Sequence, residues 1–203
     1  MSETEAMLSE VDALRGDIYQ LLARLLRQSP DVELLAWLAE LEIEQDGTRL
    51  AECWADLAKA AAQADPERLQ RAHFRHLVGV IQGDIVPYAS WYQQGELMEA
   101  ALVALRRDLR VLGFERSERT HEPEDHLAAV CEVMGMLVEA QAHEQVAFFQ
   151  QHLAPWAKRC FDDVADVETA FYAALGALGS AFMESEQARI SDRAAHQPVR
   201  LVT

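Results

Sequence analysis

Apolar residues recur at helical spacing along nearly the whole chain. The stripes that indicate helices cover residues 8–25, 34–41, 50–64, 66–79, 97–112, 127–138, 146–153 and 167–182. No segment keeps the period-two alternation of a half-buried strand. The stripes are wider than the two-per-heptad seam of a coiled coil. We therefore expect an all-α fold, a globular bundle of about eight to ten helices.

Prolines and glycines indicate where these helices begin and end. Ser29-Pro30 ends the first helix, and Gly47 separates the second from the third. Pro66 and Pro123 suit the first turn of the helices that follow them, because that turn needs no amide donor. Pro155 should end or kink the helix before it, because a helix interior does need that donor.

Two stretches interrupt the helical pattern. VIQGDIVPYASWY at residues 80–92 is the longest apolar stretch that we expect to be non-helical, and GFERSERTHE at residues 113–122 predicts a connecting loop. We expect an N-terminal helical half at 1–112, a hinge at 113–122 and a C-terminal helical half at 123–185. Residues 186–203 are weakly patterned and predict a poorly ordered tail.

The chain is strongly acidic, with 34 acidic residues against 18 basic ones and a formal net charge of −16. Residues 31–67 and residues 122–168 each hold 10 acidic and 2 basic residues, whereas residues 68–121 are mildly basic. A surface of this sign repels a polyanion, so we expect no nucleic-acid partner. A solvated acidic surface explains the charge without a function, and a basic partner is the alternative explanation.

The cysteines and the start of the chain indicate the compartment. Cys53, Cys131 and Cys160 are widely spaced and odd in number, which argues against a CxxC site and a disulfide framework. The start, MSETEAMLSEVDALRGD, is acidic where an export signal is basic. No apolar run approaches the ~20 residues that cross a bilayer. We expect a cytoplasmic protein with no stable membrane insertion.

Signatures of common enzyme classes are missing from the sequence. Neither the glycine pattern of a phosphate-binding loop nor the GxSxG turn of a serine hydrolase is present. Gly176 and Gly179 lie three residues apart in an Ala-rich helix, where close packing of two helices explains them best.

Glutamate–histidine pairs are the remaining candidates for metal chemistry. They are Glu118/His121, Glu139/His143 and Glu122/His126. The first lies in the predicted loop and the second suits a surface pair. The third belongs to a dense cluster at a helix start, residues 121–126, where capping stabilises a helix by roughly 0.3–1 kcal/mol and explains the acids. Capping gives no special reason for His126.

Four motifs follow one another along the chain. They are FRHLVGV (74–80), PYASWY (87–92), Glu122-Pro123-x-Asp125-His126, and His152-Leu153-x-Pro155-Trp156 within FFQQHLAPWAKRCF (148–161). They resemble, in the same order, the F-x-x-L-F-x-G, P-Y-x-S-x-Y, E-P-x-D-H and H-L-x-P-W motifs of the TorD/DmsD/NarJ family of redox-enzyme maturation chaperones. Val78 stands where that family usually has an aromatic residue.

The resemblance implies an all-helical cytoplasmic chaperone, not an enzyme, with the E-P-x-D-H motif near its hinge. Such a protein binds the apo catalytic subunit of a molybdenum or tungsten oxidoreductase, at its twin-arginine signal peptide or its mature body. It assists cofactor insertion and prevents premature export. The resemblance implies no cofactor beyond weak GTP binding in some members, since the client carries the molybdopterin. It leaves a monomer and a domain-swapped dimer both open.

A twin-arginine signal joins two guanidinium groups to an apolar segment, so carboxylates and an apolar groove would complement it. The candidate client-binding residues are Tyr88, Ser90, Trp91, Tyr92, Glu122, Asp125 and His126. We expect the two carboxylates to face the arginines, the aromatic rings to line the groove, and the histidine to position the carboxylates or set the hinge. The residues expected to be structural are Pro87, Pro123, His152, Pro155 and Trp156.

Other interpretations of the same residues stay open at this point. Aromatic residues in PYASWY also suit a loop that packs on the core. A metal-dependent or nucleotide-hydrolysing helical enzyme would be centred on His121, Glu122, Asp125 and His126. An acidic helical adaptor without a molybdoenzyme client fits the composition equally well. The leading interpretation has neither catalytic nor metal-binding residues.

Overall fold

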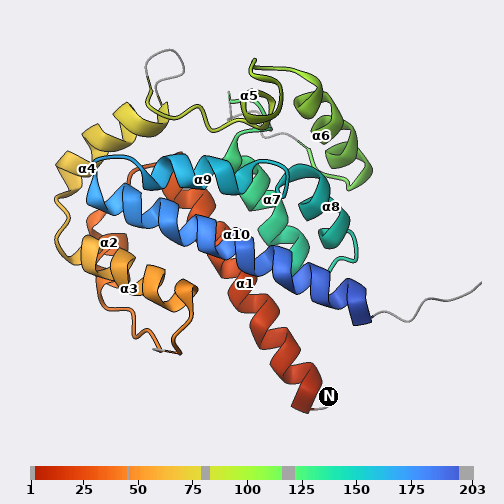
Figure 1. Ribbon diagram of the computed structural model, residues 1–203, viewed down its shortest axis with the longest axis horizontal. Coiled ribbons are helices and arrows are strands. Elements are labelled where there is room, and N and C mark those ends of the chain that lie inside the picture. The colour runs from red at the N-terminus through yellow and green to blue at the C-terminus, as the bar shows by residue number, and fades with distance from the viewer. Residues whose placement is uncertain (1–2, 45, 79–82, 116–121, 197–203) are drawn as a thin grey trace, which may run out of the picture.

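The computed structural model describes residues 3–44, 46–78, 83–115 and 122–196, which are predominantly helical (Figure 1). The helices of these ranges are α1 (Glu3–Arg27), α2 (Val32–Ala39), α3 (Arg49–Ala62), α4 (Pro66–His73), the π-helix η1 (Phe74–Val78), α5 (Ala89–Gln94), α6 (Ala100–Val111), α7 (Leu127–Glu139), α8 (Gln145–His152), α9 (Ala157–Ala165) and α10 (Ala170–His196). The described ranges contain no strand beyond one isolated bridge. The all-α prediction is confirmed.

The helices α2 and α4 begin close to their predicted positions, and a side chain caps the start of each. Asp31 accepts a hydrogen bond from the amide of Leu34 at the start of α2, and Asp65 accepts one from Arg68 at the start of α4. Pro66 occupies the first turn of α4 as predicted. α8 ends at His152, one residue before the end of the predicted stripe and three residues before Pro155.

The longest helices build the core. α1 packs along α7, and α10 packs along both α3 and α9. In Figure 1 the blue α10 crosses the red α1, while α6 lies at the edge of the molecule. Buried residues from both sides of the predicted hinge belong to one hydrophobic cluster, Leu22 and Met134 among them. Residues 116–121 of that hinge lie outside the described ranges, and the division into halves stays a prediction.

Two glycines allow α9 and α10 to lie close together. A Cβ atom at Gly176 would come within 2.2 Å of the backbone nitrogen of Ala165, and one at Gly179 within 2.2 Å of the Phe161 ring. Real Cβ atoms do not approach other atoms so closely, so only glycine fits here. The packing explanation for both glycines is confirmed.

The chain stays helical from residue 186 to residue 196, which corrects this part of the predicted tail, while residues 197–203 lie outside the described ranges. α10 continues to His196, and Glu186 and Ile190 are buried. Arg15 in α1 binds both carboxylate oxygens of Glu186 at 2.7 Å, and the Tyr19 hydroxyl donates to the same group at 3.0 Å. A buried ion pair between distant segments holds this end in place, and no apolar stripe reveals such a pair.

Helices also differ from prediction around the motifs. Residues 89–92, expected to be non-helical, lie in α5, and residues 74–78 form the π-helix η1 instead of continuing α4. Pro123 precedes α7 in a turn, where its carbonyl accepts from the amide of His126 at 3.2 Å. The prediction that Pro123 begins this helix was wrong, because tertiary contacts at His126 set the boundary.

Two further observations concern the cysteine thiols and the capacity of the helices to cross a membrane. All three cysteines are buried and free. Among the described helices, none combines the length and the apolar character that a bilayer crossing requires.

Candidate functional site

The PYASWY and E-P-x-D-H segments meet in space and pair through their backbones. The amide of Leu127 donates to the carbonyl of Pro87 at 2.8 Å, and the amide of Ala89 donates to the carbonyl of Asp125 at 2.9 Å. Tyr88 and His126 form the isolated antiparallel bridge between these bonds. The two motifs are thus a single structural unit at the starts of α5 and α7. We call residues 87–90 and 125–127 the motif junction.

Asp125 is the polar centre of the motif junction. Its side chain is only 1% exposed, and its Oδ2 atom accepts from the Ser90 amide at 3.0 Å and the Ser90 hydroxyl at 2.5 Å. The Ser90 oxygen in turn accepts from the amide of Glu99 at 3.3 Å, just before α6. Asp125 therefore ties the beginnings of α5, α6 and α7 together. Its second oxygen, Oδ1, is buried and has no hydrogen-bond partner.

His126 caps α7, which gives the reason for this histidine that the sequence left open. Its Nδ1 atom accepts from the Ala128 amide at 3.0 Å, so the proton of the neutral ring sits on Nε2. Burial, with smaller contributions from Arg27 and His73, lowers the pKa of His126 from 6.5 to about 3. The ring also meets the Tyr88 ring edge to face, with centroids 5.0 Å apart. His126 is accordingly a neutral structural cap.

Exposure divides the predicted client-binding residues into two groups. Tyr88, Ser90, Asp125 and His126 are buried. Burial, followed by the charges of Glu122 and Asp125, raises the pKa of Tyr88 to about 12, so its phenol stays neutral. The accessible members are Trp91, which is 45% exposed, and Glu122, whose side chain is 49% exposed.

Tyr92 is intermediate in exposure between these two groups, and it links α5 to α9. Its hydroxyl donates to Asp163 at 2.5 Å, and its carbonyl accepts from Arg159 at 2.7 Å. Its ring packs beside Trp156 with a centroid separation of 5.7 Å. Burial and the neighbouring Cys160 raise the pKa of Tyr92. Tyr92 therefore has a structural role, because its contacts link α5 to α9 and to Trp156.

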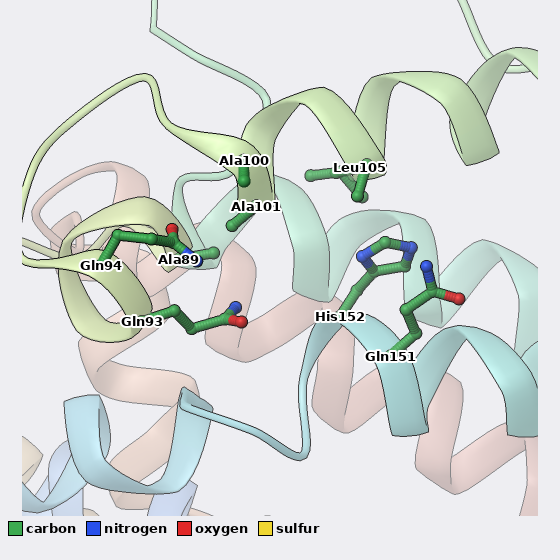
Figure 2. A pocket seen from close by; sticks show the side chains of 9 residues that line it. Ala89, Gln93, Gln94, Ala100, Ala101, Leu105, Gln151 and His152 are labelled. Carbon is green, nitrogen blue, oxygen red and sulfur yellow. The ribbon is translucent and has the colours of Figure 1, made fainter.

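The H-L-x-P-W motif contacts α5 through Trp156 and α6 through His152. Trp156 is buried, and its indole nitrogen donates to the carbonyl of His152 at 2.7 Å. His152 donates from Nε2 to Asp108 in α6 at 3.0 Å. Burial lowers the pKa of His152 although Asp108 opposes the shift. The ring faces a cavity of about 220 Å³ between α5, α6 and α8, with Gln151 beside it (Figure 2).

A larger groove of about 790 Å³ lies beside the motif junction, between α6 and α7. Its lining residues are Arg27, Leu105, Arg106, Leu109, Arg110, Phe114, Glu115, Glu122, Glu124, Ala129, Val130, Glu132, Val133 and Met136. Arg106 pairs with Glu124 at 2.7 Å, and Arg27 pairs with Glu132 at 2.5 Å. Of the predicted client-binding residues, Glu122 contributes to this surface. The sequence did carry one signal for the groove, since α7 is apolar on more than one face.

The cluster proposed for metal chemistry is arranged differently from a metal site. Nδ1 of His126 already accepts the capping hydrogen bond, and Nε2 lies 3.8 Å from Glu122. His121 lies outside the described ranges. The side chain of His143 is 94% exposed and contacts Glu144, not Glu139. Across the described ranges, no group of three or more His, Cys, Asp or Glu residues is placed to hold a metal ion.

Fold and site together define an all-helical protein whose motifs are built into the scaffold beside a groove. The sequence model of the nitrate reductase delta subunit family matches residues 43–162, more than half of the chain. The chain belongs to this family, which confirms the resemblance that the four motifs carry.

Relatives with assigned names are chaperones, not enzymes. The chain is 29% identical to the chaperone protein TorD of Actinobacillus succinogenes over 127 residues, which cover 61% of this chain and 64% of that protein. It is 29% identical to the Tat proofreading chaperone DmsD of Salmonella typhi over 153 residues, or 73% of this chain and 75% of that one.

A solved structure shares the fold. It is the crystal structure of a protein described as a redox enzyme maturation protein from Archaeoglobus fulgidus. The two structures superpose with a TM-score of 0.54 at 17% sequence identity, over 86% of this chain and 94% of the other.

Proposed function

We propose that this protein is a cytoplasmic chaperone for the apo catalytic subunit of a molybdenum or tungsten oxidoreductase. It binds the twin-arginine signal peptide of that subunit, holds it while the cofactor is inserted, and delays export until insertion is complete. Membership of the family and the names of its relatives support this proposal. The observation that carries it is the motif junction, which fixes three helix starts beside a groove.

The candidate residues have two roles, and the burial of each side chain determines which role it has. Trp91 and Glu122 are exposed and contact the client directly. Asp125, Ser90 and His126 are buried and act by holding α5, α6 and α7 in the binding geometry. A carboxylate on the surface of a chain with net charge −16 attracts the arginine pair.

Titration with a synthetic twin-arginine signal peptide tests this function. Isothermal titration calorimetry at low salt should show one peptide per chain, and 0.5 M salt should weaken binding because part of the attraction is electrostatic. A control peptide with both arginines replaced by glutamine should bind more weakly. Absence of any binding at low salt would contradict the signal-peptide role.

A further inference from the structure

The cavity between α5, α6 and α8 differs in chemistry from the rest of this acidic molecule. Four alanines and Leu105 form its apolar walls, and three glutamines and His152 supply its polar groups. These lining residues all lie in the described ranges, and they include no acidic residue, lysine or arginine. Over the whole chain, 26% of the residues are charged and the formal net charge is −16. A cavity with such walls suits an uncharged ligand.

His152 provides a fixed hydrogen-bond acceptor in this cavity. Its side chain is 6% exposed, its Nε2 atom donates to Asp108 at 3.0 Å, and Phe148 packs against its ring with a centroid separation of 4.9 Å. Because burial lowers the pKa of His152, the ring is neutral at pH 7, with its proton on Nε2. The Nδ1 atom is then an acceptor, and within the described ranges it has no hydrogen-bond partner. A buried acceptor of this kind favours a ligand that donates to it.

Carboxamide side chains from α5 lie across the cavity from His152. Figure 2 shows the amide of Gln93 facing the imidazole ring, with Gln94 beside it on the same helix. Both glutamines are exposed, as is Gln151 of α8, so these side chains border the entrance from solvent. A carboxamide both donates and accepts hydrogen bonds. A ligand with an N–H group next to a carbonyl can therefore donate to His152 and accept from a glutamine.

The alanines of α6 set the size of the ligand. Ala100, Ala101 and Ala104 leave space beside α5 and α8 that longer side chains would fill. An apolar cavity of roughly 150 Å³ holds a benzene molecule. The volume of about 220 Å³ therefore accommodates one ring with a polar substituent. A phosphate group would find no basic side chain among the lining residues, so the lining favours a neutral molecule over a nucleotide.

We propose that this cavity binds a small uncharged molecule, a planar ring that carries a primary carboxamide or a lactam. The N–H group of the ligand donates to Nδ1 of His152, and its carbonyl accepts from the amide of Gln93. The apolar part of the ring lies against the alanines of α6. The bound ligand contacts α5, α6 and α8 and stabilises their arrangement. This site does not depend on the proposed chaperone function.

NMR titration of the full chain, with its alanine methyl groups labelled with carbon-13, tests the site. The probes are benzamide, which is a primary carboxamide, 2-pyridone, which is a lactam, and benzoate, which has the shape of benzamide but is an anion without a donor. Benzamide and 2-pyridone should each cause saturable shifts of the Ala101 and Ala104 methyl signals. Benzoate should bind at least about tenfold more weakly than benzamide, because the cavity offers its charge no partner.

Two variants locate the binding, each with a matched control. Ala104→Leu fills part of the cavity and should raise the Kd of benzamide about tenfold or more, whereas Ala188→Leu changes an exposed alanine of α10 and should leave it unchanged. Gln93→Leu removes one hydrogen bond to the ligand and should raise the Kd by up to about tenfold. Gln70→Leu, at an exposed position of α4, should have no effect.

Each possible result decides for or against the site. Saturable binding of neither benzamide nor 2-pyridone would overturn it, and so would binding of benzoate as tight as that of benzamide. Unchanged Kd values for Ala104→Leu and Gln93→Leu would show that the probes bind elsewhere. Because Gln93 is exposed, its variant should fold and decides the location even where Ala104→Leu fails to fold. The signal-peptide titration tests the chaperone function separately.

Discussion

At the scale of single residues, the motifs act mainly through hydrogen bonds inside the protein. Asp125 and His126 look like surface ligands in the sequence, yet each is buried and bonded to backbone amides. Glu122, three residues earlier, is half exposed. One five-residue motif therefore contains both buried structural positions and an exposed position.

Removal of the Ser90 hydroxyl should destabilise the junction. Ser90→Ala deletes a buried donor to Asp125 and the acceptor for the Glu99 amide. We expect the free energy of unfolding to fall by about 1–3 kcal/mol, as measured by urea denaturation. Ser191→Ala is the control, because its exposed hydroxyl donates to the Gln187 carbonyl within α10 and its loss should cost little. Equal stability of both variants would contradict the role of Ser90.

Neutral His126 makes stability depend on pH in a defined window. Its pKa is about 3 in the folded protein and 6.5 as a free side chain, so the unfolded chain binds a proton between these values and the folded chain does not. Stability contributed by this group is complete above pH 6.5 and is lost as the pH falls towards 3.

Comparison of urea denaturation at pH 7.5 and pH 5.5 measures this effect. His126→Asn keeps a capping acceptor and should lose about 1 kcal/mol less than wild type between the two pH values. The exposed His143 gives the control variant, His143→Asn, which should lose as much as wild type. A pH response of His126→Asn equal to that of wild type would show that His126 titrates normally.

At the scale of elements, local pattern predicts the long helices and tertiary contacts determine the rest. The stripe from Leu8 to Leu25 predicts α1 because its period reports which face is buried. α5 has only six residues, and Asp125 holds it from 35 positions away. The end of α10 depends on Arg15, 171 positions from Glu186. Such long-range partners leave no periodic trace in the sequence.

Contact between α9 and α10 should not tolerate a methyl group. Gly176→Ala would place its Cβ against the rigid backbone of Ala165, so we expect a loss of at least about 1–3 kcal/mol of stability. Gly16→Ala in α1 is the matched control, because its nearest neighbour is the side chain of Glu139 at 3.1 Å and alanine favours the helix. Thermal unfolding should show a clear fall in Tm for Gly176→Ala alone.

Loss of the buried pair between α1 and α10 should be costly. Glu186→Gln removes one of the two carboxylates that pair with the buried guanidinium of Arg15 and leaves Asp12 at 2.6 Å as the other, so we expect a loss of about 1–3 kcal/mol in urea denaturation. Glu184→Gln breaks exposed pairs with Arg49 and Lys158 and should cost about 1 kcal/mol or less. Similar losses for both variants would contradict a structural role for the buried pair.

At the scale of the whole molecule, sequence patterns predicted the family and fold class of the protein better than the arrangement of its candidate functional site. The four motifs identified the family, and the family match confirms them. The groove between α6 and α7 combines Leu105 with Val133 from separate helices, so no linear motif contains it. The sequence likewise placed Ser90 and Asp125 in the right motifs without showing that they bond to each other.

The central claim is that this acidic helical protein holds an unfinished oxidoreductase subunit. The most direct measurement is capture of its partners from the native host by a tagged full-length chain, identified by mass spectrometry, with molybdopterin synthesis either intact or blocked. We predict that a molybdenum or tungsten oxidoreductase catalytic subunit is captured, and that more of it is captured when cofactor synthesis is blocked. Capture of no such subunit, or of the cofactor-loaded form in equal amount, would contradict the account.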